Sequence, residues 1–184
     1  MVKHLILFIL IFSFMACDKD DGNLIPDIYT GTASVTINGE EWNSLTYFDE
    51  INSSKNPSLF ILRMDRYNNA GIQIESFNIR RIQASFEVQE ITSTDNQNEL
   101  GLLSAGYLTI YGGDVLGDIY DLDTTAINNF IQITSYNSSR AEIKGIFNVS
   151  LILTRDSNEP GTPPQNLVFT NGEFTVKVQR EWFE

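Results

Sequence analysis

The sequence has very few of the side chains that usually carry acid–base or nucleophilic chemistry near neutral pH. Its 184 residues include one histidine, His4, and one cysteine, Cys17, and both lie in or directly after an apolar N-terminal segment. The rest of the chain therefore has neither an imidazole nor a thiol, which excludes Ser-His-Asp and Cys-His catalysis and His/Cys zinc or copper sites. No glycine-rich phosphate loop of either standard spacing occurs.

Basic residues are also scarce. The chain has 12 Lys and Arg against 24 Asp and Glu, and its net charge is −12. Because an acidic surface repels phosphate backbones, we predict no nucleic-acid partner. A single cysteine cannot form an intramolecular disulfide, so the fold must depend on its core. After the N-terminal segment, no apolar run is long enough to cross a bilayer.

The N-terminal segment itself is typical of a targeting signal. Lys3 gives a basic start, Leu5 to Met15 is apolar except for Ser13, and the small residue Ala16 precedes Cys17. A helix of this length would rise roughly 16 Å, which is too short for a hydrocarbon core of about 30 Å. We therefore predict a secretory signal peptide over residues 1–16, cleaved before Cys17.

Phe14-Met15-Ala16-Cys17 resembles the lipobox of bacterial lipoproteins, although Phe14 departs from the usual leucine. The resemblance implies that the Cys17 thiol is diacylated and that the protein is held to a membrane by this lipid. Two or more acyl chains give firm attachment, since each buried CH₂ contributes about 0.8 kcal/mol. The alternative is an ordinary signal peptide followed by an incidental cysteine.

Asp18-Lys19-Asp20-Asp21 resembles the acidic tract that follows the lipidated cysteine in surface-exposed lipoproteins of Bacteroidota. This resemblance implies a cell-envelope lipoprotein of the outer membrane. In enterobacteria, an aspartate at the position of Asp18 would instead favour retention in the inner membrane, so the choice of membrane and leaflet stays open. A solvated spacer would have the same composition.

The clearest indication of local structure is a turn pattern near residue 38, between two runs in which apolar and polar residues alternate. Asn38-Gly39 is a two-residue turn pattern, because both positions of such a turn need positive φ. This turn would set Val35 opposite Trp42 on the core face. Asn171-Gly172 repeats the pattern near the end of the chain and predicts a second hairpin.

Apolar residues nowhere recur at helical spacing over three turns, whereas short alternating runs separated by Gly, Asn, Asp and Pro recur throughout. The longest run, residues 143–153, places Ile143, Gly145, Phe147, Val149, Leu151 and Leu153 on one face. About ten such strands predict an all-β fold, either an antiparallel β-sandwich or a β-barrel. We expect a polar tether over residues 17–32 and a single β domain over residues 33–184.

Three segments of this domain carry a further resemblance. They are Val35-Thr36-Ile37-Asn38-Gly39 with Trp42, Gly145-Ile146-Phe147-Asn148-Val149, and Thr170-Asn171-Gly172-Glu173-Phe174-Thr175-Val176. Together they resemble a group of uncharacterised all-β lipoproteins of Bacteroidota over most of the mature chain. The motifs consist of turn and core residues, so the resemblance implies a fold and a location and assigns no catalytic residue.

Four aspartates, Asp114, Asp118, Asp121 and Asp123, lie within ten residues. Oxygen ligands at this density could hold calcium, which takes about six to eight of them, but the spacing is not that of an EF-hand loop. On a strand over residues 115–122, Asp121 and Asp123 share one face and Asp118 takes the other. We predict a solvent-exposed, metal-free edge or turn and keep Asp118, Asp121 and Asp123 as candidate metal ligands.

Tyr107, Tyr111 and Tyr120, together with Tyr136, lie in or beside predicted strands. A tyrosine offers a flat ring and a polar tip, which suits a sugar or peptide ligand. The alternative is a half-buried sheet face, where β-propensity alone favours tyrosine. We keep Tyr107, Tyr111 and Tyr120 as candidate ligand-binding residues.

These observations favour a membrane-anchored, non-catalytic β domain that binds a carbohydrate or a protein partner at the cell envelope, and no motif implies a cofactor. A carboxylate-based carbohydrate-active enzyme is the second hypothesis, because a glycosidase can work with two carboxylates alone. No pair stands out among the many Asp and Glu residues. A structural subunit of an envelope assembly is the third hypothesis and would expose a large apolar patch.

Overall fold

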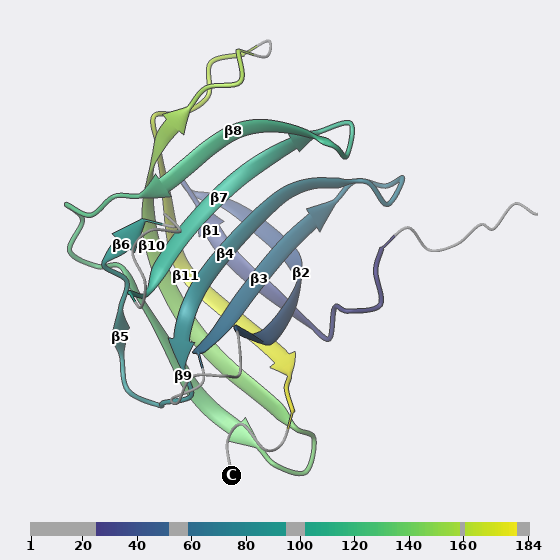
Figure 1. Cartoon of the computed structure of the whole chain (residues 1–184), viewed down its shortest axis with the longest axis vertical. Helices are drawn as coiled ribbons and strands as arrows, with labels where there is room; N and C mark the ends of the chain where they lie inside the picture. The colour runs from purple at the N-terminus through teal and green to yellow at the C-terminus, as the bar shows by residue number, and fades with distance from the viewer. Residues whose placement is uncertain (1–24, 52–58, 95–101, 159–160, 180–184) are drawn as a thin grey trace, which may run out of the picture.

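The computed structural model describes residues 25–51, 59–94, 102–158 and 161–179 (Figure 1). The predicted signal peptide and Cys17 lie outside these residues. The described residues form one eleven-stranded sheet and include no helix able to span a bilayer. The strands are β1 (Gly31–Ile37), β2 (Glu40–Ile51), β3 (Leu59–Tyr67), β4 (Gln73–Gln83), β5 (Gln89–Glu90), β6 (Ser93–Thr94), β7 (Ser104–Tyr111), β8 (Val115–Leu122), β9 (Phe130–Asn137), β10 (Glu142–Arg155) and β11 (Asn166–Lys177).

Eight of these strands close into an antiparallel barrel. The ring runs β1-β2-β3-β4-β7-β8-β10-β11, and β11 pairs with β1 to complete it. The short strand β6 pairs in parallel with β7, whereas β9 extends the first half of β10 and carries β5 on its far edge. The predicted all-β fold is confirmed, and of the two architectures left open the chain forms the barrel.

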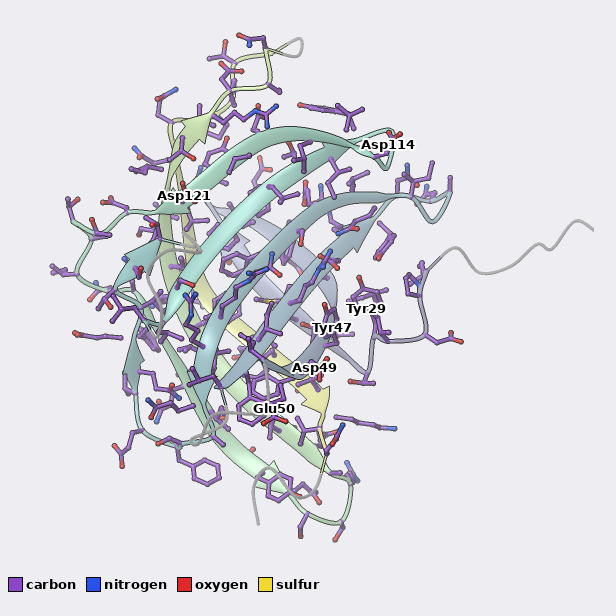
Figure 2. All side chains as sticks on the ribbon, in the orientation of Figure 1. Tyr29, Tyr47, Asp49, Glu50, Asp114 and Asp121 are labelled. Atoms are coloured by element: carbon purple, nitrogen blue, oxygen red, sulfur yellow. The ribbon has the colours of Figure 1, made fainter. Side chains whose placement is uncertain are left out.

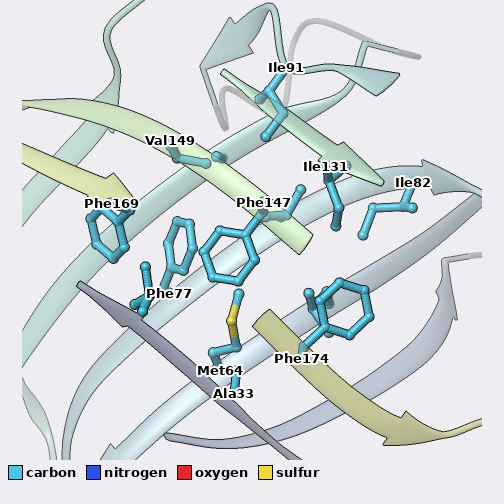
Figure 3. Packing of buried hydrophobic residues seen from close by; sticks show 14 of the residues in the cluster. Ala33, Met64, Phe77, Ile82, Ile91, Ile131, Phe147, Val149, Phe169 and Phe174 are labelled. Atoms are coloured by element: carbon cyan, nitrogen blue, oxygen red, sulfur yellow. The ribbon is translucent and has the colours of Figure 1, made fainter. Parts of the chain in front are cut away.

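Side chains alternate between the barrel interior and its outer surface. On β10 the predicted inward row is confirmed from Ile143 to Leu151, because Ile143, Gly145, Phe147, Val149 and Leu151 are all buried. Leu153, near the end of the strand, is only half-buried. The interior around these residues is filled by side chains, as expected for a closed barrel of eight strands. Phe77 stacks on Phe169 with ring centroids 4.5 Å apart and lies 5.6 Å from Phe147 (Figure 3).

The first predicted hairpin is confirmed. Asn38 and Gly39 have φ values of 50° and 92°, and Val35 lies opposite Trp42 in the register between β1 and β2. Both residues are buried. This turn therefore starts the meander and directs the Trp42 indole into the barrel.

The second predicted hairpin is wrong. Residues 166–177 form one continuous strand, β11, which pairs with β1 on one side and β10 on the other. Asn171 has a φ of 54° and lies at a bulge, where the register with β10 shifts. A Cβ on Gly172 would lie 2.6 Å from the Phe147 ring. The Asn-Gly pair thus bends a barrel strand and leaves room for a core aromatic.

The chain reaches the barrel across its outer wall. β1 begins at Gly31, inside the range predicted as a tether. Just before it, the Tyr29 hydroxyl donates a hydrogen bond to Asp65 and lies 2.7 Å from the Tyr67 hydroxyl, and the Tyr29 ring packs edge-on against Tyr47 (Figure 2). Asp65 is fully buried and also accepts a 2.8 Å ion pair from Arg63. Because every one of these groups has a partner, this cluster fixes the stretch of chain around Tyr29, directly before β1.

Candidate functional site at the polar end of the barrel

The types of side chain that line the barrel interior change along the barrel axis. Towards the end at which the β3–β4 and β7–β8 hairpins turn, polar and ionisable side chains replace the phenylalanines and isoleucines. They come from the last residues of β3 and β7, the first residues of β2 and β4, and the middle of β7 and β8. We call this set the polar mouth, and it comprises Trp42, Arg66, Glu75, Tyr107, Tyr111, Asp118 and Tyr120.

Glu75 is the centre of one half of the polar mouth. Arg66 Nη2 donates to Glu75 Oε1 at 2.6 Å, and the Trp42 indole N–H donates to Glu75 Oε2. The Tyr107 hydroxyl donates a third hydrogen bond to the same carboxylate. The Glu75 side chain is 14% exposed and that of Arg66 is 40% exposed. These donors fix the position of the Glu75 carboxylate within the mouth.

Tyr107 and Tyr120 join the two halves of the mouth. Their ring centroids are 5.8 Å apart, and both side chains are buried. Burial, followed by the charge of Glu75, raises the pKa of Tyr107 above its usual range, and burial raises the pKa of Tyr120 to about 12. Both phenols therefore stay protonated near neutral pH and act as hydrogen-bonding groups.

Asp118 lies in the second half, and the prediction that it is solvent-exposed is wrong. It is only 9% exposed, and its Oδ1 accepts hydrogen bonds from Ser157 N and Oγ at 2.9 and 2.7 Å. Ser157 belongs to the loop after β10, which covers the carboxylate. The alternation of β8 turns Asp118 inward with Tyr120, and local sequence gives no sign of that distant loop.

The other aspartates lie elsewhere. Asp114 is exposed at the tip of the β7–β8 hairpin (Figure 2), and Asp121 points to the opposite face of β8 from Asp118, as predicted. Asp123 follows the strand, and hydrogen bonds from Thr125 Oγ1 and N, at 2.6 and 2.9 Å, hold the pKa of its carboxyl below the usual range. Among the described residues, no three His, Cys, Asp or Glu side chains come close enough to hold a metal ion.

Tyr111 is brought to the same end of the barrel by a close approach at β8. A Cβ on Gly117 would lie 2.6 Å from the Tyr111 ring and 2.2 Å from Thr109 Oγ1. Thr109 Oγ1 in turn accepts a 2.8 Å hydrogen bond from the backbone N–H of Asp118. The structure therefore brings all three candidate tyrosines together with Asp118 and leaves Asp121 and Asp123 outside.

No family model matches this chain, and neither the curated proteins nor the solved structures contain a match. The site therefore has to be judged by its own chemistry.

Shallow hollows also occur on the outer surface. One of about 420 Å³ lies over β1, β2 and β11, and another of about 540 Å³ lies beside the β9–β10 hairpin. Their charged residues, such as Glu173 and Lys144, are exposed to solvent. Because exposed charges in strands are ordinary, these hollows are weaker candidates than a set of ionisable groups inside the barrel.

Sequence analysis missed Trp42, Arg66 and Glu75 as site residues. Arg66 and Glu75 lie directly opposite each other in the β3–β4 pairing, on either side of the turn at residues 68–71. A hairpin register drawn through that turn would have paired the two charges. It would not have shown that they point into a closed barrel, because closure depends on strands far away in the sequence.

Proposed function

We propose that this chain is a lipid-anchored, non-catalytic binding protein of the bacterial cell envelope, attached to the outer membrane through Cys17. Its ligand or partner would bind at the polar mouth. The observation that carries the binding proposal is a set of ionisable groups inside one end of a barrel that is otherwise filled with apolar side chains. Enclosing charges costs stability, so a fold that keeps them at one end is a candidate for a function located there.

The same geometry argues against catalysis by paired carboxylates. Glu75 and Asp118 both point into the barrel, but each already accepts at least two hydrogen bonds from protein donors. A glycosidase needs one carboxyl group protonated and aimed at the leaving group. Carboxylate oxygens that already accept protein donors are not free to be aimed at a leaving group, whereas such bonds are well suited to fixing the geometry of a binding site.

The anchoring proposal rests on the lone cysteine after Ala16 and is tested by cell fractionation. The wild-type chain should sediment with membranes, and Cys17→Ser should be released into the soluble fraction because it cannot be acylated. Asp18→Asn is the matched control, since it changes the adjacent residue and keeps the thiol, and it should remain with membranes. A Cys17→Ser variant that still sediments with membranes would contradict the lipid anchor.

A further inference from the structure

The two halves of the polar mouth differ in charge balance. Around Tyr107, the negative charge of Glu75 is opposed by Arg66. Around Tyr120, the charges that act on the hydroxyl are those of Asp118 and Asp156, with Tyr111 beside them, and no arginine or lysine of the described residues is among them. We call this second half the acidic corner, comprising Tyr111, Asp118, Tyr120 and Asp156.

The acidic corner also contains hydrogen-bonding groups that the protein leaves unused. Tyr120 is only 2% exposed, yet its hydroxyl makes no hydrogen bond within the part of the chain that the structure describes. On Asp118, Oδ1 takes both bonds from Ser157, and Oδ2 has no partner among the described residues. Neither free atom is among the polar atoms sealed from solvent. Asp118 and Tyr120 are two residues apart on the buried face of β8, so their unused oxygens offer two acceptors on one face to a donor from outside.

We propose that the acidic corner binds an organic cation through an ammonium group, which donates hydrogen bonds to Asp118 Oδ2 and to the Tyr120 hydroxyl oxygen. The inference rests on the proposed function, because it names the class of ligand for the same polar mouth. Carboxylates without a cation of their own attract positive charge, and tyrosine rings add a cation–π contribution.

Other ligand classes fit this corner less well. An anion would meet Asp118 and Asp156 with no compensating basic group. Calcium takes about six to eight oxygen ligands, and the described residues hold no group of three acidic side chains close enough to supply them. An ammonium group needs only two or three acceptors, and the corner offers that number.

The test is an NMR titration of the lipidated full chain in a non-ionic detergent with 2-phenylethylammonium. Its neutral counterpart, 2-phenylethanol, and the anion 3-phenylpropanoate are titrated in parallel. The ammonium probe should shift the backbone amides of residues 109–111 and 118–120 in a saturable way, with about tenfold higher affinity than the alcohol. That factor is the one expected of a charge-assisted hydrogen bond.

Three variants locate the binding. Asp118→Asn keeps an oxygen for Ser157 but removes the charge, and it should weaken binding of the ammonium probe about tenfold. Tyr120→Phe removes only the hydroxyl and should also weaken it. Asp121→Asn removes the same charge from the outward face of the same strand and should leave the affinity unchanged.

Equal affinity for the ammonium and the alcohol, or equal losses in Asp118→Asn and Asp121→Asn, would overturn the assignment of a cation. If the alcohol or the anion shifts the same amides while the ammonium probe does not, the ligand class is wrong and the polar mouth stands as a binding site. Absence of saturable shifts at these amides with all three probes would contradict both the ligand class and the site.

Discussion

Glu75 organises the polar mouth at the scale of single residues. Its carboxylate is the shared acceptor for Arg66, Trp42 and Tyr107, so three donors from three other strands converge on one side chain. Removal of a shared acceptor leaves each of its donors without a partner inside the barrel. Enclosed donors without partners are costly, which makes Glu75 the most sensitive position of the network.

We therefore expect Glu75→Ala to lower the free energy of unfolding by about 3 kcal/mol, since it leaves an arginine and two further donors unpaired. Urea unfolding followed by tryptophan fluorescence measures the change. Glu173→Ala, at an exposed carboxylate on β11, is the matched control and should stay within about 0.5 kcal/mol of wild type. A Glu75→Ala variant as stable as this control would show that the network does not hold the barrel end.

The buried tyrosines predict a loss of stability at high pH. Burial raises the pKa of Tyr120 from 10.0 to about 12, so the folded state keeps the phenol protonated where the unfolded chain has released the proton. The stabilising contribution is fully present below pH 10 and is lost as the pH rises towards 12. Urea unfolding at steps between pH 9 and 12 measures it, and Tyr120→Phe should flatten the decline. A decline of the same steepness in that variant would assign the effect to other groups.

At this scale the sequence anticipated part of the site. Tyr107, Tyr111 and Tyr120 were marked by their alternation on predicted strands, and Asp118 was separated from Asp121 by the two-residue period of β8. Arg66 and Glu75 carried no such mark, because an exposed ion pair across a hairpin has the same sequence pattern. Only the closure of the barrel turns this pair into part of an interior site.

The two Asn-Gly pairs show that the same dipeptide can form a hairpin turn or a bulge within a continuous strand. At Asn38-Gly39 the chain reverses and both residues adopt positive φ, whereas at Asn171-Gly172 only the asparagine does so and the strand continues. Both flanks of the second pair find partners on β1 and β10, and this tertiary pairing overrides the local turn signal.

At the first hairpin, substitution of Gly39 tests backbone strain separately from steric clashes. A Cβ on Gly39 meets nothing within 4 Å, so its φ of 92° is the only obstacle to substitution. We expect Gly39→Val to lower the free energy of unfolding by about 2 kcal/mol, because a β-branched residue resists positive φ. Gly39→Asn is the control and should cost clearly less, since asparagine tolerates this region. Equal losses in thermal unfolding of the two variants would contradict the strain explanation.

At the scale of the whole molecule, sequence patterns predicted an all-β domain but did not choose between a sandwich and a barrel. Closure depends on the pairing of β1 with β11, which joins Gly31 to Val176. Such contacts carry no local signal, because the same alternating strands can pack as two sheets or as one closed sheet. The charged and aromatic residues of the polar mouth can be read from the sequences of the individual strands. That they meet at one end of the barrel follows only from the closed topology.

We propose that the polar mouth is kept for binding and not for stability. Replacement of one partner in an enclosed ionic network is destabilising, whereas replacement of all partners by apolar residues of similar size is often neutral or stabilising. The decisive variant therefore combines Trp42→Phe, Arg66→Met, Glu75→Leu and Tyr107→Phe, which removes the whole Glu75 network at once.

The most direct test is the thermal unfolding midpoint of this fourfold variant beside wild type and Glu75→Ala. If the network is kept for binding, the fourfold variant should recover most of the stability that Glu75→Ala loses, with a midpoint close to that of wild type. A midpoint as low as that of Glu75→Ala, or lower, would mean that the barrel needs these polar groups to stay folded, and it would contradict a mouth kept for binding alone.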